Sequence, residues 1–193
     1  MFAFARHRTA AGRARRSAAA GGAAALIALT TGCDVLIGTS NVETSDDITV
    51  TSPMLREGET IPARYTCAGD GVSPPLRWSG LPSDTESLAL VVDEAESSGG
   101  ATVLWVVYGI DPVNPEFPEG SVPQPAQQGQ NSLGNAAYEP PCPEEGVEHE
   151  FRFTVYALSE QLDLGDSATL DVALGAIASH TLARGRLTTV SAS

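Results

Sequence analysis

His149 is the side chain whose surroundings best suit binding or acid–base chemistry. It follows a rigid Pro/Cys turn, Glu139-Pro-Pro-Cys-Pro143, and comes just before a stretch in which apolar and polar residues alternate strictly. Such alternation is typical of a half-buried strand. The apolar face of this strand holds Phe151, Phe153, Val155 and Ala157. Because His149 shares their parity, we predict that it lies where the buried face opens toward the loops, a common place for a binding pocket.

Catalysis through His149 has little support in the sequence. The chain contains no Gly-x-Ser-x-Gly elbow, no His-Glu-x-x-His motif and no Gly-rich loop suited to a phosphate. His180 falls in the last turn of an expected helix, where the helix dipole favours it, and we interpret it as structural. Ser132 and Ser179 are conceivable nucleophiles, but nothing in the sequence places either beside His149. We therefore expect a protein that is not an enzyme and that uses no metal or cofactor.

Charge divides the chain into two parts. The first 33 residues carry five arginines and no acid, whereas the rest carries six arginines, no lysine and all 24 acidic residues, a net charge of −18. A surface of this kind repels nucleic acid and anionic lipid headgroups. We interpret the acids as a solvated face and expect no nucleic-acid partner.

Residues 1–33 have the pattern of an export signal, with an Arg-rich start and a run of small apolar residues from Ala18 to Ala28. The run is short and Ala/Gly-rich for a membrane span. Its end, Thr31-Gly-Cys33, resembles a lipobox, although Thr30 stands where Leu is usual. We predict that Cys33 is lipidated and anchors the protein to the outer face of the cytoplasmic membrane. The alternative is ordinary signal-peptidase cleavage, which would discard Cys33. Residues 34–47 are rich in Ser, Thr, Asn and Asp and predict a flexible tether.

The domain that follows, residues 48–193, carries several motifs of one family in order. They are Tyr65-Thr-Cys-Ala-Gly69, Ser73-Pro-Pro-Leu76 with Trp78, Gly129-Gln-Asn-Ser-Leu-Gly134, and Pro140-Pro-Cys-Pro143, which leads through His149 into Phe153-Thr-Val-Tyr-Ala-Leu158. Together they resemble the phosphatidylethanolamine-binding protein (PEBP) family, in particular its bacterial and archaeal branch of Raf-kinase-inhibitor-like proteins. The resemblance covers roughly Ile48 to Val190. It implies a mainly β fold of mostly antiparallel sheets with Greek-key character and few helices, one of them near the C-terminus.

Local patterns agree with that fold. We expect strands at 48–52, 87–93, 102–110 and 184–190, and the second should be buried on both faces because it is continuously apolar. Residues 111–130 are Pro- and Gln-rich without periodicity, which predicts a long surface loop. Residues 168–184 predict a helix with Asp166 or Ser167 as its cap. Trp78 is expected in the core.

The resemblance also implies a small pocket that binds anions such as phosphate or phosphorylated headgroups. Its parts, carried over residue by residue, are Glu94, Glu96, Trp105, Pro141, His149 and Phe151. Two departures remove cationic groups, because Leu104 replaces a family His and Glu150 stands where Arg is common. Each carboxylate opposes a phosphate ~4 Å away by about 1 kcal/mol in water and about 4 kcal/mol at an effective dielectric of ~20. We therefore predict a pocket for a neutral or amine-bearing ligand. The alternative is a strand-edge histidine without a ligand.

Two cysteines, Cys67 and Cys142, remain once Cys33 is assigned to the lipid. An exported domain with two internal cysteines tends to pair them, and the family resemblance brings their loops together beside the pocket. Such a bond would close a loop of about 75 residues and contribute ~4 kcal/mol in the chain-entropy model. The alternatives are two free thiols, or a metal site with His149, for which the spacing gives weak support.

These inferences predict a non-catalytic, lipid-anchored protein of the cell envelope that binds a small molecule or a protein partner. A second interpretation, taken from the reputation of the family, is an inhibitor of a kinase or peptidase acting through surface loops such as 111–130. A weak hydrolase that uses His149 is the third.

Overall fold

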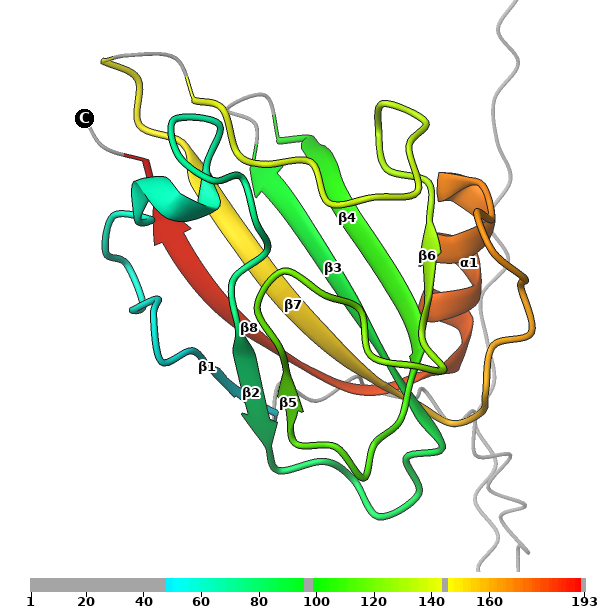
Figure 1. The fold of residues 1–193 in the computed structure, drawn as a ribbon. Coiled ribbons are helices and arrows are strands. Elements are labelled where there is room, and N and C mark those ends of the chain that lie inside the picture. The colour runs from blue at the N-terminus through cyan, green and yellow to red at the C-terminus, as the bar shows by residue number, and fades with distance from the viewer. Residues whose placement is uncertain (1–47, 96–98, 144–145, 192–193) are drawn as a thin grey trace, which may run out of the picture. The chain divides into compact units, whose positions relative to one another are not determined.

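The computed structural model describes residues 48–95, 99–143 and 146–191, which belong to one compact unit, residues 40–193. Two sheets form its layers (Figure 1). The larger has the order β6 (Gln127–Gly129), β4 (Ala101–Ile110), β3 (Ser87–Ala95), β7 (Glu150–Leu158) and β8 (Thr181–Val190). The smaller has the order β1 (Thr49–Thr51), β2 (Leu76–Ser79) and β5 (Glu116–Phe117). Neighbouring strands in both sheets are antiparallel.

The helix α1 (Leu170–His180) lies in the connection between β7 and β8, and a 3₁₀ turn covers Ala63–Tyr65. The expectation of a mainly antiparallel β fold with a helix near the C-terminus is therefore confirmed.

Two hydrophobic clusters hold the layers together. The first lies between the sheets, where Leu90 of β3 belongs to the same cluster as Trp78 of β2. The second lies on the other face of the larger sheet, where Ala89 of β3 packs with Ile177 of α1. β3 is therefore buried on both faces, as its unbroken apolar run predicted, and Trp78 lies in the core as expected.

The prediction for the helix was wrong at both ends. α1 ends at His180, and the chain continues at once as β8, whose Thr181 pairs with Leu158 of β7. From Ala183 onward every second residue is buried, a period that suits a strand, and pairing along the whole of β7 outweighs the local helical pattern. The N-cap is Thr169, which makes no side-chain capping bond, rather than Asp166 or Ser167.

Residues 111–130 are more ordered than a surface loop. They contain β5 and β6, and the side chains of Phe117 and Ala126 are buried in the first cluster. Strands of two or three residues are too short to show a period, so only pairing with Leu76 and Val106 makes them strands.

The predicted export signal, tether and lipidation at Cys33 fall on residues 1–47 and lie outside the described residues. Within the three described ranges, no helix is long and apolar enough to cross a bilayer.

Candidate functional site

The centre of the site is a contact between Glu94 and His149. Glu94 lies near the end of β3, where it pairs with Phe151 of β7, and His149 immediately precedes β7. Alternation along the two antiparallel strands brings both side chains to the same face. The Nδ1 atom of His149 contacts Oε1 of Glu94, and the two side chains are 22% and 21% exposed. This half-buried pair matches the position that strand parity predicted for His149.

The contact with Glu94 determines which ring nitrogen of His149 donates a hydrogen bond. An ionised carboxylate only accepts hydrogen bonds, so the Nδ1–H group of His149 donates a hydrogen bond to Oε1 of Glu94. The other ring nitrogen, Nε2, is buried and has no hydrogen-bond partner in the described part of the chain. In a neutral ring with this tautomer, Nε2 is a hydrogen-bond acceptor.

Neighbouring groups hold the imidazole in place. The backbone N–H of His149 donates to Oγ of Ser191 over 2.9 Å, and the Ser191 N–H donates to the His149 carbonyl over 2.9 Å. The Ser191 hydroxyl in turn donates to the Val147 carbonyl over 3.0 Å. The ring of Phe151 lies parallel to the imidazole, with centroids 6.4 Å apart, and is fully buried. Phe151 therefore supports the histidine from within the core.

The acidic loop is only partly in the site. Glu96 lies outside the described residues. Asp93 precedes Glu94 and therefore faces the opposite side of the sheet, where it forms an ion pair with Arg152. Burial raises the pKa of Asp93, although the hydrogen bond and charge of Arg152 act in the other direction. Glu94 is the carboxylate that the described structure brings to His149.

Trp105 lines a cavity whose walls include neither Glu94 nor His149. A bulge in β4 pairs Trp105 with Val92 and Val103 with Asp93, so Leu104 is the extra residue and both Leu104 and Trp105 face the first hydrophobic cluster. The Trp105 indole N–H donates to Oε1 of Gln128 over 2.7 Å. Its ring makes edge-to-face contacts with Phe117 and Tyr138, at 5.5 and 5.2 Å between centroids. Trp105, Tyr138 and Gln128 line a cavity of about 400 Å³ together with residues 71–73 and 120–122, and none of these is charged.

The Pro/Cys turn lies next to β4. Cys67 and Cys142 form a disulfide, with Cα atoms 5.2 Å apart, which confirms the predicted pairing. The Cys67 N–H donates to the carbonyl of Pro141 over 3.0 Å, and the Glu139 N–H donates to the carbonyl of Leu104 over 3.0 Å. Pro141 is buried, and these bonds and the disulfide attach the turn to β4 and to the loop that carries Cys67.

The structure thus brings together three of the six predicted pocket residues, Glu94, His149 and Phe151. Sequence reasoning missed Ser191, which bonds the backbone on both sides of the imidazole. A single serine near the end of the chain gives no signal of that role, because only the β7–β8 pairing brings it to His149.

Known proteins resemble this chain over most of the described domain. A family model described as phosphatidylethanolamine-binding protein matches residues 51–192. A UPF0098 protein of Methanothermobacter thermautotrophicus is 38% identical over 66% of this chain and 87% of its own length. A Mycobacterium tuberculosis protein named "Putative lipoprotein LppC" is 38% identical over 77% of this chain and 74% of its own length.

Two solved structures share the fold. The PEBP homologue CT736 of Chlamydia trachomatis has a TM-score of 0.70 and 32% identity, and the match covers 77% of this chain and 99% of CT736. YbcL of E. coli, described as a member of the mammalian PEBP family, has a TM-score of 0.70 and 26% identity, covering 75% of this chain and 98% of YbcL.

The fold and the site define a mainly antiparallel β domain with a half-buried histidine–carboxylate pair where one strand ends and another begins. The chain belongs to the phosphatidylethanolamine-binding protein family, in the bacterial and archaeal branch that includes the UPF0098 proteins and YbcL.

Proposed function

We propose that this protein is a non-catalytic, membrane-anchored member of the family that binds a small neutral or amine-bearing ligand at Glu94 and His149. The observation that carries the proposal is the state of the imidazole, whose Nδ1 is engaged by Glu94 while Nε2 is buried and has no partner in the described ranges. Buried polar atoms without a partner are uncommon in folded proteins. A ligand that donates a hydrogen bond to Nε2 would satisfy this atom.

The charges around the pair favour this class of ligand. Glu94 brings a carboxylate, and Leu104, where the family has a histidine, is apolar and buried. Arg152 is three residues from His149 in the chain, but it is on the opposite face in an ion pair with Asp93. A carboxylate ~4 Å from a phosphate opposes binding by about 4 kcal/mol at an effective dielectric of ~20, whereas an ammonium group gains a similar energy.

The two serines considered as nucleophiles have other hydrogen-bond partners in the described part of the chain. A histidine held by a carboxylate is half of a catalytic triad, but the candidate serines have other partners. The hydroxyl of Ser132 accepts the Val103 N–H, and that of Ser179 donates to the Gly175 carbonyl. The Ser191 hydroxyl bonds the backbone next to His149 rather than the ring. These contacts support binding rather than turnover.

The membrane anchor is supported by the lipobox-like sequence around Cys33 and by the relative named as a lipoprotein, which matches 77% of this chain. Intact mass spectrometry of the protein made in its own host tests it. A diacylglyceryl group on Cys33 is the expected result, and a mature chain that begins after Cys33 would contradict it.

Thermal shift measurements with small amines, neutral metabolites and inorganic phosphate test the site. We expect stabilisation by an amine or neutral compound that His149→Ala and Glu94→Gln both abolish. His180→Ala is the matched control, because His180 pairs with Glu160 at the other end of β7 and should leave the shift intact. Micromolar binding of phosphate, or a shift that survives His149→Ala, would refute the proposed site. Hydrolysis of ester substrates that depends on His149 would refute the non-catalytic role.

A further inference from the structure

The cavity of about 400 Å³ beside Trp105 is lined by neither Glu94 nor His149. Its walls come from the strands β4 and β6, from the loops that precede β2 and follow β5, and from Tyr138, just before the Pro/Cys turn. Ligand-binding pockets in proteins have volumes of about 300–1,000 Å³, so this cavity is large enough for a small molecule. We call it the Trp105 cavity.

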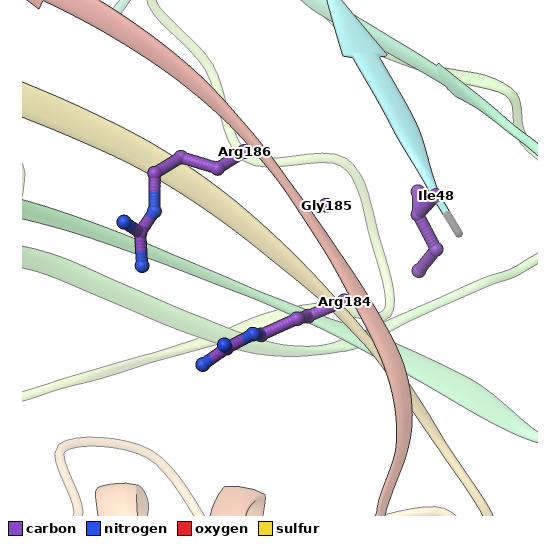
Figure 2. Close-up of a pocket in the computed structure, with 4 residues that line it drawn as sticks. All are labelled: Ile48, Arg184, Gly185 and Arg186. Carbon is purple, nitrogen blue, oxygen red and sulfur yellow. The ribbon is translucent and has the colours of Figure 1, made fainter. Parts of the chain in front are cut away.

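Figure 2 shows another hollow, of about 280 Å³, which Ile48, Arg184, Gly185 and Arg186 line. The side chains of Arg184 and Arg186 extend to one side of β8, whereas Ile48 lies on the other side. Because these residues do not face one common space, a single small ligand cannot contact all of them.

The Trp105 cavity has no charged side chain in its lining, although acidic residues are abundant in this protein. Glu119 precedes the lining residue Gly120, but its carboxylate accepts hydrogen bonds from Arg64 over 2.7 Å and from the Tyr65 hydroxyl over 2.8 Å. A charged ligand would lose hydration on entering the cavity without gaining a counter-ion, which is costly. The lining therefore favours an uncharged ligand.

Trp105 and Tyr138 give the cavity two aromatic walls that are held in place. Their rings meet edge to face with centroids 5.2 Å apart, and the Tyr138 hydroxyl donates to the Tyr65 carbonyl over 3.1 Å. The Gly120 N–H donates to the Ser73 carbonyl over 3.0 Å and so joins two of the loops that form the walls. A preformed site of this kind lowers the entropy cost of binding, and flat rings pack well against aromatic side chains.

Two polar side chains of the cavity have groups to offer a ligand. The indole N–H only donates, so Gln128 presents Oε1 to Trp105 over 2.7 Å and keeps its amino group for another partner. Ser73 is only 4% exposed although it lines the cavity. Within the described ranges, no hydrogen bond engages the Ser73 hydroxyl or the Gln128 amino group. A nearly buried hydroxyl without a partner is uncommon, and a ligand would satisfy it.

We propose that the Trp105 cavity is a second binding site, for small uncharged compounds that combine a flat ring with an amide or hydroxyl group. The ring packs against Trp105 and Tyr138. The polar group of the ligand accepts a hydrogen bond from Gln128 and forms another with the Ser73 hydroxyl. This site needs neither the membrane anchor nor His149, so it is independent of the proposed function.

NMR spectroscopy of the purified protein, labelled with ¹⁵N, tests the site. The chain has two tryptophans and therefore two indole N–H signals. The Trp105 signal reports on the cavity, and Gln128→Leu identifies it by removing its acceptor. Trp78 does not line the cavity, so its signal is an internal control. The probes are benzamide, benzoate and benzylamine, which share a ring and differ in charge. We expect benzamide to shift the Trp105 signal saturably, with a dissociation constant of about 1 mM or below. The two charged probes should bind at least about tenfold more weakly.

Matched serine variants test the polar contact. Ser73→Ala removes one hydrogen bond to the ligand and should weaken benzamide binding about 3- to 10-fold. Ser79→Ala is the control, because Ser79 is exposed near the end of β2, does not line the cavity and should leave binding unchanged. His149→Ala should also leave the benzamide titration unchanged, which separates this site from the one at Glu94 and His149.

Several outcomes would overturn the proposal. They are a Trp105 signal that benzamide does not shift saturably, equal shifts with the three probes, or equal effects of Ser73→Ala and Ser79→Ala. Loss of the benzamide shift in His149→Ala would place the ligand at the other site. Comparison of the three probes on the unmodified protein decides the matter even if Ser73→Ala fails to fold.

Discussion

Gly185 and Gly175 provide a paired test of the packing that joins the two sheets. Gly185 lies on β8 opposite Val155, and the backbone of Ile48 crosses directly over it. A Cβ atom at position 185 would overlap the carbonyl carbon and oxygen of Ile48, which are backbone atoms and cannot rotate away. Gly175 is exposed inside α1, and a Cβ there would meet nothing within 4 Å. The same substitution should therefore have opposite effects at the two positions.

The surroundings of the two glycines set the expected change in the free energy of unfolding. Overpacking in a core costs about 1–3 kcal/mol, and because backbone must move we expect Gly185→Ala to cost about 2–3 kcal/mol. For a domain of this size each kcal/mol corresponds to about 2–4 °C, so Tm should fall by roughly 5–10 °C. Gly175→Ala removes backbone entropy from the unfolded chain and should stabilise by about 0.5–1 kcal/mol.

Urea and thermal unfolding of both variants measure these effects. The reasoning requires a lower urea midpoint for Gly185→Ala, a higher one for Gly175→Ala, and an unchanged m value in both. A Gly185→Ala variant as stable as the unmodified protein would show that Ile48 does not lie against β8.

Three further predictions concern stability. Replacing Cys67 and Cys142 by Ser should lower the free energy of unfolding by up to about 4 kcal/mol, measured against the oxidised protein, and reductant should reproduce the loss. Hydrogen bonds from Arg64 and Tyr65 hold the pKa of Glu119 below its usual value. Ionised Glu119 therefore stabilises the fold fully at pH values above its pKa in the unfolded chain. This stabilisation is lost as the pH falls through the lowered pKa of the folded protein. Glu119→Gln should therefore be less stable than the unmodified protein at neutral pH and equal to it in acid, by urea midpoints across that range. Gln128→Leu leaves the buried Trp105 N–H without its acceptor and should lower the free energy of unfolding by about 1–3 kcal/mol. Gln130→Leu is the control, because it also replaces a half-buried glutamine but leaves the Trp105 hydrogen bond in place.

Features that depend on the residues of a single strand were predicted correctly from the sequence. The alternation after His149 predicted β7 and the side of the sheet on which the imidazole lies, since parity depends only on the residues of one strand. The continuous apolar run of β3 predicted burial on both faces for the same reason. The pairing of Cys67 with Cys142 was expected because an exported domain with two internal cysteines tends to pair them, and the family resemblance brought their loops together.

Features that depend on pairing between distant strands were missed. The helix stops at His180 because β8 pairs along β7, and β5 and β6 exist only through their partners. Trp105 was expected beside His149, but the bulge at Leu104 sets Leu104 and Trp105 on the inner face, where Trp105 lines a cavity that His149 does not line. A bulge shifts the register by one residue, and no single-strand pattern reveals it.

The sequence alone determined the β character of the domain, its family and the position of His149 just before a strand. These features follow from composition, from motifs and from the alternation of side chains along one strand. Tertiary structure alone decided that His149 contacts Glu94 and that Asp93 does not, and that Ser191 bonds the backbone of His149. Those contacts join residues far apart in the chain, and their energies depend on a register that only the packed sheets define.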